Sequence, residues 1–468
     1  MTATRIPDAR PAVDARRAAI GVALVLVAQL MLILDTTIVT VALPRIDAGL
    51  GFGAASLSWV INAYGLAFGG LLLVGGRLGD VYGRRRVLEI GLALFTAASL
   101  LGALAQSPGW LVAARALQGI GAALTAPGVL ALVHTSATDE AGRHRALALF
   151  SAVGIGGGAL GLVLGGLLTD VGSWRWTLLI NVPLGVAVLA SIRRFVAETT
   201  RRPDRFDVVG AVSATGAAVA IVWALIGAPD KGWTSARTLG GLGLGVVLIA
   251  VLAVAERRVT HPMLRLVLLR DRRRVGALVV TTMVFGAQFS MFFLTVQYVQ
   301  KVLGLTPLAA GAAFLPMSVG IFAMSRVTPR LVARFGQAPL LMIGTLGLTA
   351  CMAWLSRAGA GSSYFGAVFG PMLLDGVAAG LTFMPAASLV VGGVEAEHAG
   401  SASGMLQTMQ QLGGAIGLAV VASVYASGAV PGAFVPGLRD ALLTSGAFTA
   451  IGFVVAATVI RRRRAAGR

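Results

Sequence analysis

The sequence predicts an all-α integral membrane protein with 14 transmembrane helices, arranged as two related six-helix bundles with two helices inserted between them. Three observations lead to this fold class. Of the 468 residues, 57% are hydrophobic and only 12% are charged, whereas a soluble protein carries about 25% charged residues. The chain also divides into apolar segments of membrane-spanning length, and an internal repeat relates its N-terminal half to its C-terminal half.

A bilayer core about 30 Å thick requires roughly 20 apolar residues in a helix. Fourteen segments meet this length, and several are rich in Gly and Ala, which suits close helix packing in lipid. In chain order they are 18–42, 56–75, 87–105, 110–133, 146–168, 176–192, 207–227, 238–256, 275–297, 307–325, 338–356, 362–385, 401–425 and 441–460.

The first segment resembles a signal peptide only at its start. Its apolar stretch is too long and no small-residue cleavage site follows, so we expect it to be retained as the first helix. The expected divisions are a cytoplasmic N-terminal tail (1–17), an N-terminal six-helix bundle (18–192), two linking helices (207–256), a C-terminal six-helix bundle (275–460) and a basic cytoplasmic tail (461–468).

Basic residues gather on one side of the predicted helices. Of the 38 Lys and Arg residues, 30 lie on the side of the N-terminus, seven lie on the other side, and Arg115 lies within a helix. Because cytoplasmic loops carry an excess of Lys and Arg, both termini are predicted to be cytoplasmic in a multi-pass protein of the cell membrane. The alternation of basic clusters with apolar spans argues against nucleic-acid binding, despite a net charge of +19.

An internal repeat relates the two bundles. The stretch LQGIGAALTAP (117–127) aligns with LDGVAAGLTFM (374–384) at an offset of 257, which pairs Gln118 with Asp375 and Gly119 with Gly376. A further match pairs Gly83 with Gly336. Such repeats are typical of secondary transporters, whose substrate site lies near the bilayer midplane between the halves.

Charged residues inside the bilayer are costly, and each one is a candidate functional residue. Asp35 and Arg115 both fall in the outer third of their helices, where they could pair. Gain and loss of a proton on Asp35 would then break and restore the pair, which would make it a proton-coupling switch. The alternative is a static ion pair that fixes two helices.

Asp375 lies near the middle of its predicted helix, with no Arg or Lys at its depth. It would bind a cationic substrate or carry a second proton; the alternative is a protonated Asp bonded to a neighbouring helix. We group it with Gln118, Gln288 and Phe292 as candidate residues of a substrate cavity, although such polar groups are more often interhelical hydrogen bonds and such aromatic groups more often core.

Two glycine-rich motifs complete the candidate residues. In GRLGDVYGRRR (76–86), the glycines allow a tight turn and Asp80 can face a helix N-terminus. We expect this loop to be a cytoplasmic gate rather than a generic basic turn. The predicted gate residues are Gly76, Asp80, Gly83 and Arg84. GIGGGALGLVLGG (154–166) lacks the GK[ST] ending of a phosphate loop, and we expect it to form a helix-packing face of Gly157, Gly161, Gly165 and Gly166.

These motifs resemble the major facilitator superfamily, and within it the fourteen-helix drug:proton antiporter family. The resemblance spans essentially the whole chain and implies proton coupling at Asp35 and Arg115 and a cytoplasmic gate at Asp80. Its motifs are LDTTIVTVALP (34–44), GRLGDVYGRRR (76–86), LVAARALQGIGAA (111–123), SWRWTLLINVPLG (173–185), VLGLTPLAAGAAFLP (302–316) and HAGSASGMLQTMQQLGGAIG (398–417). Two positions depart from the family pattern. Position 81, which is often basic in the family, is Val81 here, and Leu162 replaces the proline of the antiporter motif Gly-Pro-x-x-Gly-Gly.

We therefore expect a secondary active transporter rather than an enzyme, with no catalytic residues, metal site or cofactor. It would export amphiphilic drugs or antibiotics, cationic ones included, in exchange for protons by alternating access. Its partners would be the substrate, protons and the lipid bilayer, with no nucleic acid, and it would work as a monomer. Two alternatives stay open: an exporter of an endogenous metabolite, such as a self-made antibiotic, a siderophore or a lipid, and a proton symporter.

Overall fold

The regular elements of the chain are helices. The computed structural model describes residues 10–53, 56–135, 140–199, 208–258, 269–394, 399–430 and 434–460. The N-terminal half consists of α1 (Arg10–Leu50), the 3₁₀ turn η1 (Ser56–Ser58), α2 (Trp59–Tyr82), α3 (Arg84–Ala103), α4 (Pro108–Thr135), α5 (Glu140–Val171), α6 (Trp176–Leu179) and α7 (Asn181–Phe195).

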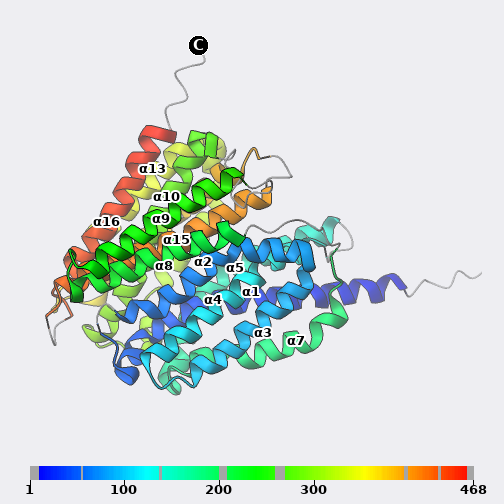
Figure 1. Ribbon diagram of the computed structural model, residues 1–468, viewed down its shortest axis with the longest axis horizontal. Helices are drawn as coiled ribbons and strands as arrows, with labels where there is room; N and C mark the ends of the chain where they lie inside the picture. The colour runs from blue at the N-terminus through cyan, green and yellow to red at the C-terminus, as the bar shows by residue number, and fades with distance from the viewer. Residues whose placement is uncertain are drawn as a thin grey trace, which may run out of the picture.

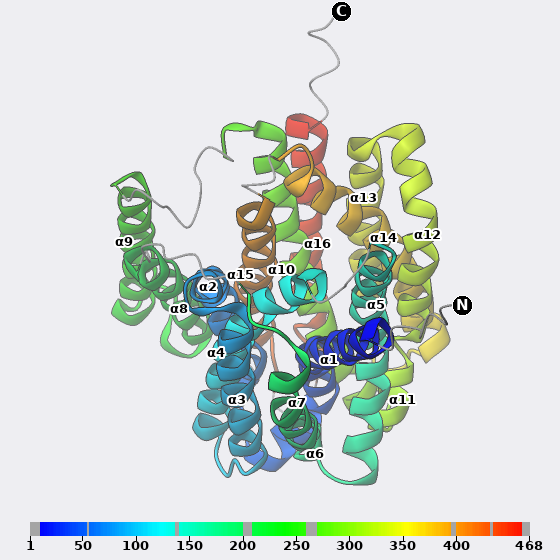
Figure 2. The same cartoon turned by 90° about the vertical axis from the view of Figure 1, so that its right-hand side faces the viewer.

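The linking helices are α8 (Val208–Lys231) and α9 (Ala236–Arg258). The C-terminal half consists of α10 (Arg272–Lys301), α11 (Pro307–Ala312), α12 (Leu315–Phe335), α13 (Gln337–Leu355), the π-helical turn η3 (Phe365–Phe369), α14 (Gly370–Val391), α15 (Ala399–Ser427), α16 (Leu438–Val455) and the π-helical turn η4 (Ala456–Ile460). The helices of the two halves form two groups in Figure 1, and α8 and α9 lie beside α2 and α15 in Figure 2.

The described residues contain 12 helices that are long and apolar enough to cross a membrane, and up to 13 if the bent α2 is one span. Each of the fourteen predicted segments overlaps a helix or a pair of consecutive helices. The predicted span 146–168 lies on α5, whose apolar part within the described residues, Gly156–Val171, is shorter than a full crossing. The all-helical membrane fold is therefore confirmed, while the count of fourteen crossings stays a prediction.

The largest apolar core shared by the two halves lies at one end, and a smaller core joins α2 to α15 through α8. We call the side on which α1 begins the N-side, and the opposite side the far side. The largest apolar core joins far-side residues of both halves, among them Leu43, Val60, Phe293, Tyr298 and Phe314. Toward the N-side each half has its own core, built from α1–α5 and α7 in one half and from α10 and α12–α16 in the other. The structure is thus closed between the halves on the far side, and the groups diverge toward the N-side in Figure 1.

Polar contacts reinforce the far-side closure. Gln300 Nε2 on α10 donates to Val41 O on α1 at 2.8 Å, and Lys301 Nζ lies 2.8 Å from Asp47 Oδ2. These contacts place the last turn of α10 against the last three turns of α1.

The linking helices cover a seam between the halves. α8 packs on both α2 and α15, and Ser423 Oγ on α15 donates to Leu225 O on α8 at 2.9 Å. α9 packs on α8 and exposes most of its aliphatic side chains, such as Leu244 and Val247. An apolar face of this kind is suited to lipid rather than water.

The repeat seen in the sequence is reproduced in the packing. Gly83 joins α2 to α3 with φ +103°, and Gly336 joins α12 to α13 with φ +81°, a region that favours glycine. A Cβ on Gly119 would meet the backbone oxygen of Tyr64, and a Cβ on Gly376 would meet that of Met317. Aligned glycines therefore make equivalent turns and equivalent helix crossings in the two halves.

Candidate functional site

The N-terminal half contains a buried ion pair between α1 and α4. Asp35 is 0% exposed and Arg115 is 1% exposed, and Arg115 Nη1 contacts Asp35 Oδ2 directly. The two residues that the sequence predicted to pair do so. Because removal of one partner from a buried pair leaves an uncompensated charge, each side chain depends on the other.

Neutral donors satisfy the other oxygen of the Asp35 carboxylate. Gln118 Nε2 on α4 and Asn181 Nδ2 on α7 each donate to Asp35 Oδ1 at 3.0 Å. Gln118 Nε2 also lies 2.7 Å from Ser99 Oγ on α3. All of these side chains are buried, which is the condition under which such polar groups need partners.

Arg115 is held on its other sides by α2 and by its own helix. Its Nε donates to Val60 O at 2.9 Å, its Nη1 donates to Gln118 Oε1 at 2.9 Å, and its Cζ lies 4.5 Å from the centre of the Tyr64 ring. The group formed by Asp35, Arg115, Gln118, Asn181, Ser99, Tyr64 and the Val60 carbonyl is called the Asp35 cluster below. It joins α1, α2, α3, α4 and α7, so a change in the charge of Asp35 is felt by most of the N-terminal half.

Sequence reasoning identified the ion pair but not its surroundings. Asn181, Ser99 and Tyr64 were not among the candidate residues. Gln118 was grouped with the substrate cavity, yet it bonds to Asp35. The only sequence signal for Asn181 was its position as a polar residue in an apolar segment.

The C-terminal half also contains a fully buried carboxyl group. Gln288 Nε2 on α10 donates to Asp375 Oδ2 on α14 at 3.1 Å, and the two residues are 5% and 0% exposed. Phe292, one turn beyond Gln288, stacks on Phe314 with ring centres 5.3 Å apart. The four residues predicted to line a cavity are therefore split: Gln118 belongs to the Asp35 cluster, and the other three lie in the C-terminal half. Their contact with a substrate stays a prediction.

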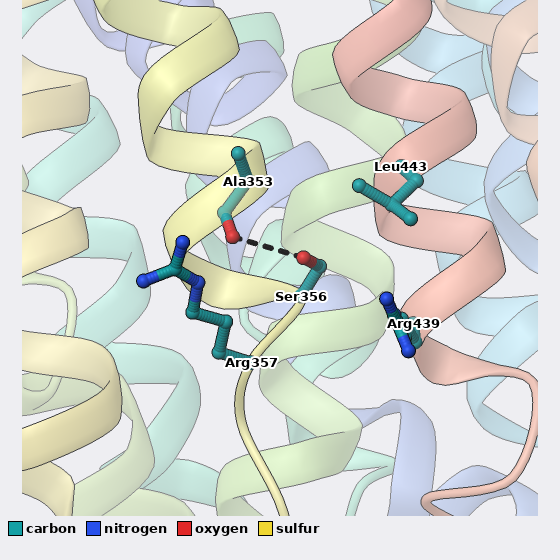
Figure 3. Close-up of a pocket in the computed structure, with 5 residues that line it drawn as sticks. All are labelled: Ala353, Ser356, Arg357, Arg439 and Leu443. Carbon is teal, nitrogen blue, oxygen red and sulfur yellow. Dashed lines mark hydrogen bonds between the residues drawn. The ribbon is translucent and has the colours of Figure 1, made fainter.

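A cavity of about 450 Å³ lies at the far end of the C-terminal half (Figure 3). It is lined by Ala353, Ser356 and Arg357 at the end of α13 and by Arg439 and Leu443 on α16. Ser356 Oγ donates to Ala353 O at 2.9 Å. None of these residues belongs to the Asp35 cluster or to the Gln288–Asp375 pair, so this cavity is separate from both buried carboxyl groups.

The predicted gate loop is a turn of a single residue. α2 ends at Tyr82, Gly83 makes the turn, and α3 begins at Arg84. Arg84 Nη2 lies 2.8 Å from Asp80 Oδ1 one helical turn earlier, and both side chains are about one-third exposed. Gly76 lies further back on α2, where an added Cβ would touch only the ring of Pro127. The loop lies on the N-side, where the two halves have separate cores.

A carboxylate that the sequence did not single out caps α3. Glu198, just after α7, accepts hydrogen bonds from the backbone N–H groups of Arg85 at 3.0 Å and Arg86 at 3.1 Å. Asp80 was expected to be able to face a helix N-terminus; it pairs instead with the Arg84 side chain, and Glu198 takes the N-terminus. A Cβ on Gly83 would lie 2.5 Å from the Glu198 carboxyl carbon, so the turn and the cap depend on each other.

The predicted glycine face of α5 packs closely, as expected, against two partners. Gly157, Gly161 and Gly165 face α1, and a Cβ on Gly165 would lie 2.8 Å from Ile38 Cα. A Cβ on Gly166 would lie 2.6 Å from Leu308 Cα on α11, in the other half. Leu162, at the position of the missing proline, is buried in the shared far-side core. The glycines thus allow α5 to touch both α1 and the C-terminal half.

The all-helical architecture, the repeat and the paired ionisable groups within apolar helices define a membrane transporter, not an enzyme. The family model of the Major Facilitator Superfamily matches residues 25–418, and the chain belongs to this family. The family resemblance predicted from the sequence is confirmed.

Relatives and solved structures agree with this membership. The chain is 40% identical to a cephamycin export protein of Amycolatopsis lactamdurans, over 86% of this chain and 84% of that protein. It is 38% identical to a puromycin resistance protein of Streptomyces alboniger, over 86% of this chain and 81% of that protein. In fold it is similar to a peptide transporter in complex with sulfate, with a TM-score of 0.66, 17% identity, and coverage of 94% of this chain and 93% of that one.

Proposed function

We propose that the chain exports amphiphilic drugs or antibiotics, cationic ones included, across the cell membrane in exchange for protons. The observation that carries this proposal is the Asp35–Arg115 pair, a titratable ion pair buried in apolar helices and bonded to several of its neighbours. Export of antibiotics is also supported by the relatives of the chain, which include a cephamycin export protein and a puromycin resistance protein.

We further propose fourteen membrane crossings, with the N-side in the cytoplasm. The domain plan is the predicted one: tails 1–17 and 461–468, bundles 18–192 and 275–460, and linking helices 207–256. The excess of basic residues on the N-side supports this orientation. In that orientation the structure is the inward-facing state, because the halves share their core on the external side.

The proposed cycle uses the Asp35 cluster as the proton site. A proton that arrives from outside neutralises Asp35 and removes the ionic part of its contact with Arg115. The loop with Gly76, Asp80, Gly83 and Arg84 then acts as the cytoplasmic gate. Export requires that the inward-facing and outward-facing states differ in affinity for both proton and drug, since a ligand with equal affinity for two states shifts neither.

The remaining predicted residues have supporting roles in this proposal. Gln288, Phe292 and Asp375 on the C-terminal side and Gln118 on the N-terminal side would form the walls of the drug path as the halves move. The α5 glycines would let α5 slide on α1 and α11, because small residues allow backbones to approach closely. The transporter would act as a monomer.

A second candidate is export of a metabolite made by the same cell. The observation that favours it is that relatives include a tetracenomycin C resistance and export protein of Streptomyces glaucescens as well as the cephamycin export protein. Proton symport stays a weaker alternative, which the direction of the substrate gradient would distinguish.

The test is transport into inverted membrane vesicles energised by a proton gradient, with puromycin, cephamycin, lincomycin and a cationic dye as probes. We expect uptake that a protonophore abolishes and that Asp35→Asn lowers at least about tenfold, which corresponds to about 1.4 kcal/mol of lost coupling. The matched control is Asp440→Asn, which changes an exposed carboxylate in the first turn of α16. Uptake that persists in Asp35→Asn and with the protonophore would refute proton coupling through this pair.

A further inference from the structure

Asp375 is a buried carboxyl group whose hydrogen bonding is incomplete. It is 0% exposed in the second turn of α14, and the one hydrogen bond described for it comes from Gln288 Nε2 to Oδ2. Its second oxygen, Oδ1, has no partner among the described residues, and neither has Gln288 Oε1. A buried carboxylate needs a cation or several donors, and Asp35 has both.

The two unpaired atoms are both acceptors on groups that already touch. What the pair lacks is a donor, and a proton on Asp375 Oδ1 would supply one. A carboxylic acid and a primary amide can form two parallel hydrogen bonds: the amide N–H donates to one acid oxygen, and the acid O–H donates to the amide oxygen. The existing Nε2–Oδ2 contact is the first of these bonds.

No charged side chain from the packed elements replaces that proton in the described part of the chain. α14 packs against α10, α12, α13, α15 and η3. The titratable group that faces Asp375 is Cys351 of α13, whose thiol donates to Pro371 O at 3.3 Å. On α10, Arg274 lies 14 residues before Gln288, or roughly 21 Å along the helix, and Tyr298 and Lys301 lie roughly 15 Å or more beyond it.

The other neighbouring elements offer no nearer cation. α12 meets Asp375's helix at Met317 and Gly376, and its first arginine, Arg326, lies nine residues further on, or roughly 13 Å. The side chains of α15 and η3 include no Lys, Arg, Asp or Glu; α15 carries Tyr425 near its far end.

The internal repeat places this pair where the Asp35 cluster lies in the other half. Gln118 on α4 corresponds to Asp375 on α14, and each bonds to the first helix of its own half: Gln118 to Asp35 on α1, and Asp375 to Gln288 on α10. The amide and the carboxyl group have exchanged helices. The position of Arg115, three residues before Gln118, is Met372 in the second half, so the arginine has no counterpart there.

We propose that Asp375 and Gln288 form a second proton-binding site, in the C-terminal half, that is loaded in the inward-facing structure and unloaded during transport. Asp375 takes the proton on Oδ1, forming an O–H bond that donates to Gln288 Oε1. In the inward-facing structure the site holds a proton rather than a drug cation, because there Asp375 has no exposed surface and is surrounded by the packed helices of one bundle. This proposal rests on proton-coupled transport for its second part only, since proton binding can be measured without transport.

Infrared difference spectroscopy of the purified full-length protein tests the binding step. We expect a carbonyl band of a protonated, desolvated carboxylic acid near neutral pH, sensitive to deuterium exchange, in the wild type. Asp375→Asn, which keeps size and hydrogen bonding, should abolish that band, while Asp35→Asn should leave it. Gln288→Leu should shift the band to higher wavenumber, because the acid O–H loses its acceptor. A spectrum that Asp375→Asn does not change would overturn the proposal.

Transport in proteoliposomes tests the unloading step. With a gradient of one pH unit and no membrane potential, each coupled proton supports about a tenfold substrate gradient. Asp375→Asn should therefore lower the maximal gradient about tenfold and still leave drug export sensitive to a protonophore. An unchanged gradient would show that the proton on Asp375 does not travel and would refute that part. The Asp35→Asn variant tests the proposed function separately: loss of proton coupling in that variant supports it, and persistence of proton coupling refutes it.

Discussion

Gly166 is a residue at which one added methyl group would directly disturb the far-side closure. In the structure, a Cβ at this position would lie 2.6 Å from Leu308 Cα and would also meet the backbone oxygen of Pro307. Both atoms are backbone at the start of α11, so neither can rotate away. Gly166→Ala must therefore separate α5 from α11, which belong to different halves.

The size of the effect follows from where the methyl group lies. Overpacking of a tight contact costs about 1–3 kcal/mol. Because this contact exists only where the halves meet on the far side, the cost falls on the far-closed state and should shift the equilibrium between the two access states about 5- to 150-fold toward opening of the far side. The same methyl group at Gly158, on the same helix, would meet nothing within 4 Å and should leave that equilibrium unchanged.

The assay is a distance measurement across the N-side. Spin labels at Arg86, where α3 begins, and at Arg334, near the end of α12, would report the separation of the halves in a Cys351→Ser background. We expect Gly166→Ala to increase the population of short distances and Gly158→Ala to match the parent. The reasoning fails if the Gly166→Ala protein is folded and its distance distribution equals that of the parent.

Three further outcomes are expected. Arg115→Met should destabilise the protein by about 3–5 kcal/mol, because it leaves Asp35 buried without a cation. The double variant Asp35→Asn/Arg115→Met should recover much of this loss when unfolding is measured in detergent. An equal loss of stability in both variants would contradict a charge-based cause. Gly83→Ala should lower stability by about 1–3 kcal/mol because residue 83 has a φ of +103°. Adding Glu198→Ala should relieve the clash between the new Cβ and the Glu198 carboxyl group but not the backbone strain, as thermal unfolding of the single and double variants would show. Lys301→Met should change stability by less than about 1 kcal/mol, because the ion pair of Lys301 with Asp47 is partly exposed. A larger loss of stability would mean that the far-side closure relies on charge.

The sequence was sufficient for the architecture because membrane helices are read from length and apolar character. Each predicted segment overlaps a helix, and the repeat predicted the shared role of Gly83 and Gly336 as turns. Asp35 and Arg115 were also identifiable, since charge within an apolar segment is rare. The count of fourteen crossings stays a prediction, because α5 begins with charged residues and its apolar part within the described residues, Gly156–Val171, is shorter than a full crossing.

The contacts of the neutral polar residues could not be predicted in the same way. A Gln or Asn in an apolar helix signals a hydrogen bond, but the partner depends on how the helices rotate and cross. Gln118 bonds to Asp35 and Gln288 bonds to Asp375, although both were placed in a drug cavity by the same signal. Glu198 was missed because it caps a helix more than 100 residues earlier in the chain, a relation that no local pattern reports.

Asp35 and Asp375 lie in separate halves, and this separation limits how they can influence each other. The Asp35 cluster has its partners within the N-terminal half, and Asp375 bonds to Gln288 in the C-terminal half. Yet α1 continues from Asp35 to Val41, about 9 Å along the helix, and α10 continues from Gln288 to Gln300, about 18 Å, where Gln300 donates to the Val41 carbonyl.

Each helix therefore carries one member of a buried polar pair and one member of the contact between the halves. A charge change that tilts α1 or α10 must strain or relieve that contact, because both are continuous helices over this distance. Coupling of this kind is energetic and reciprocal: a proton on Asp35 that weakens the far-side closure is itself bound more tightly when the far side opens. We infer that α1 and α10, rather than the exposed gate loop, connect proton binding to the change of access.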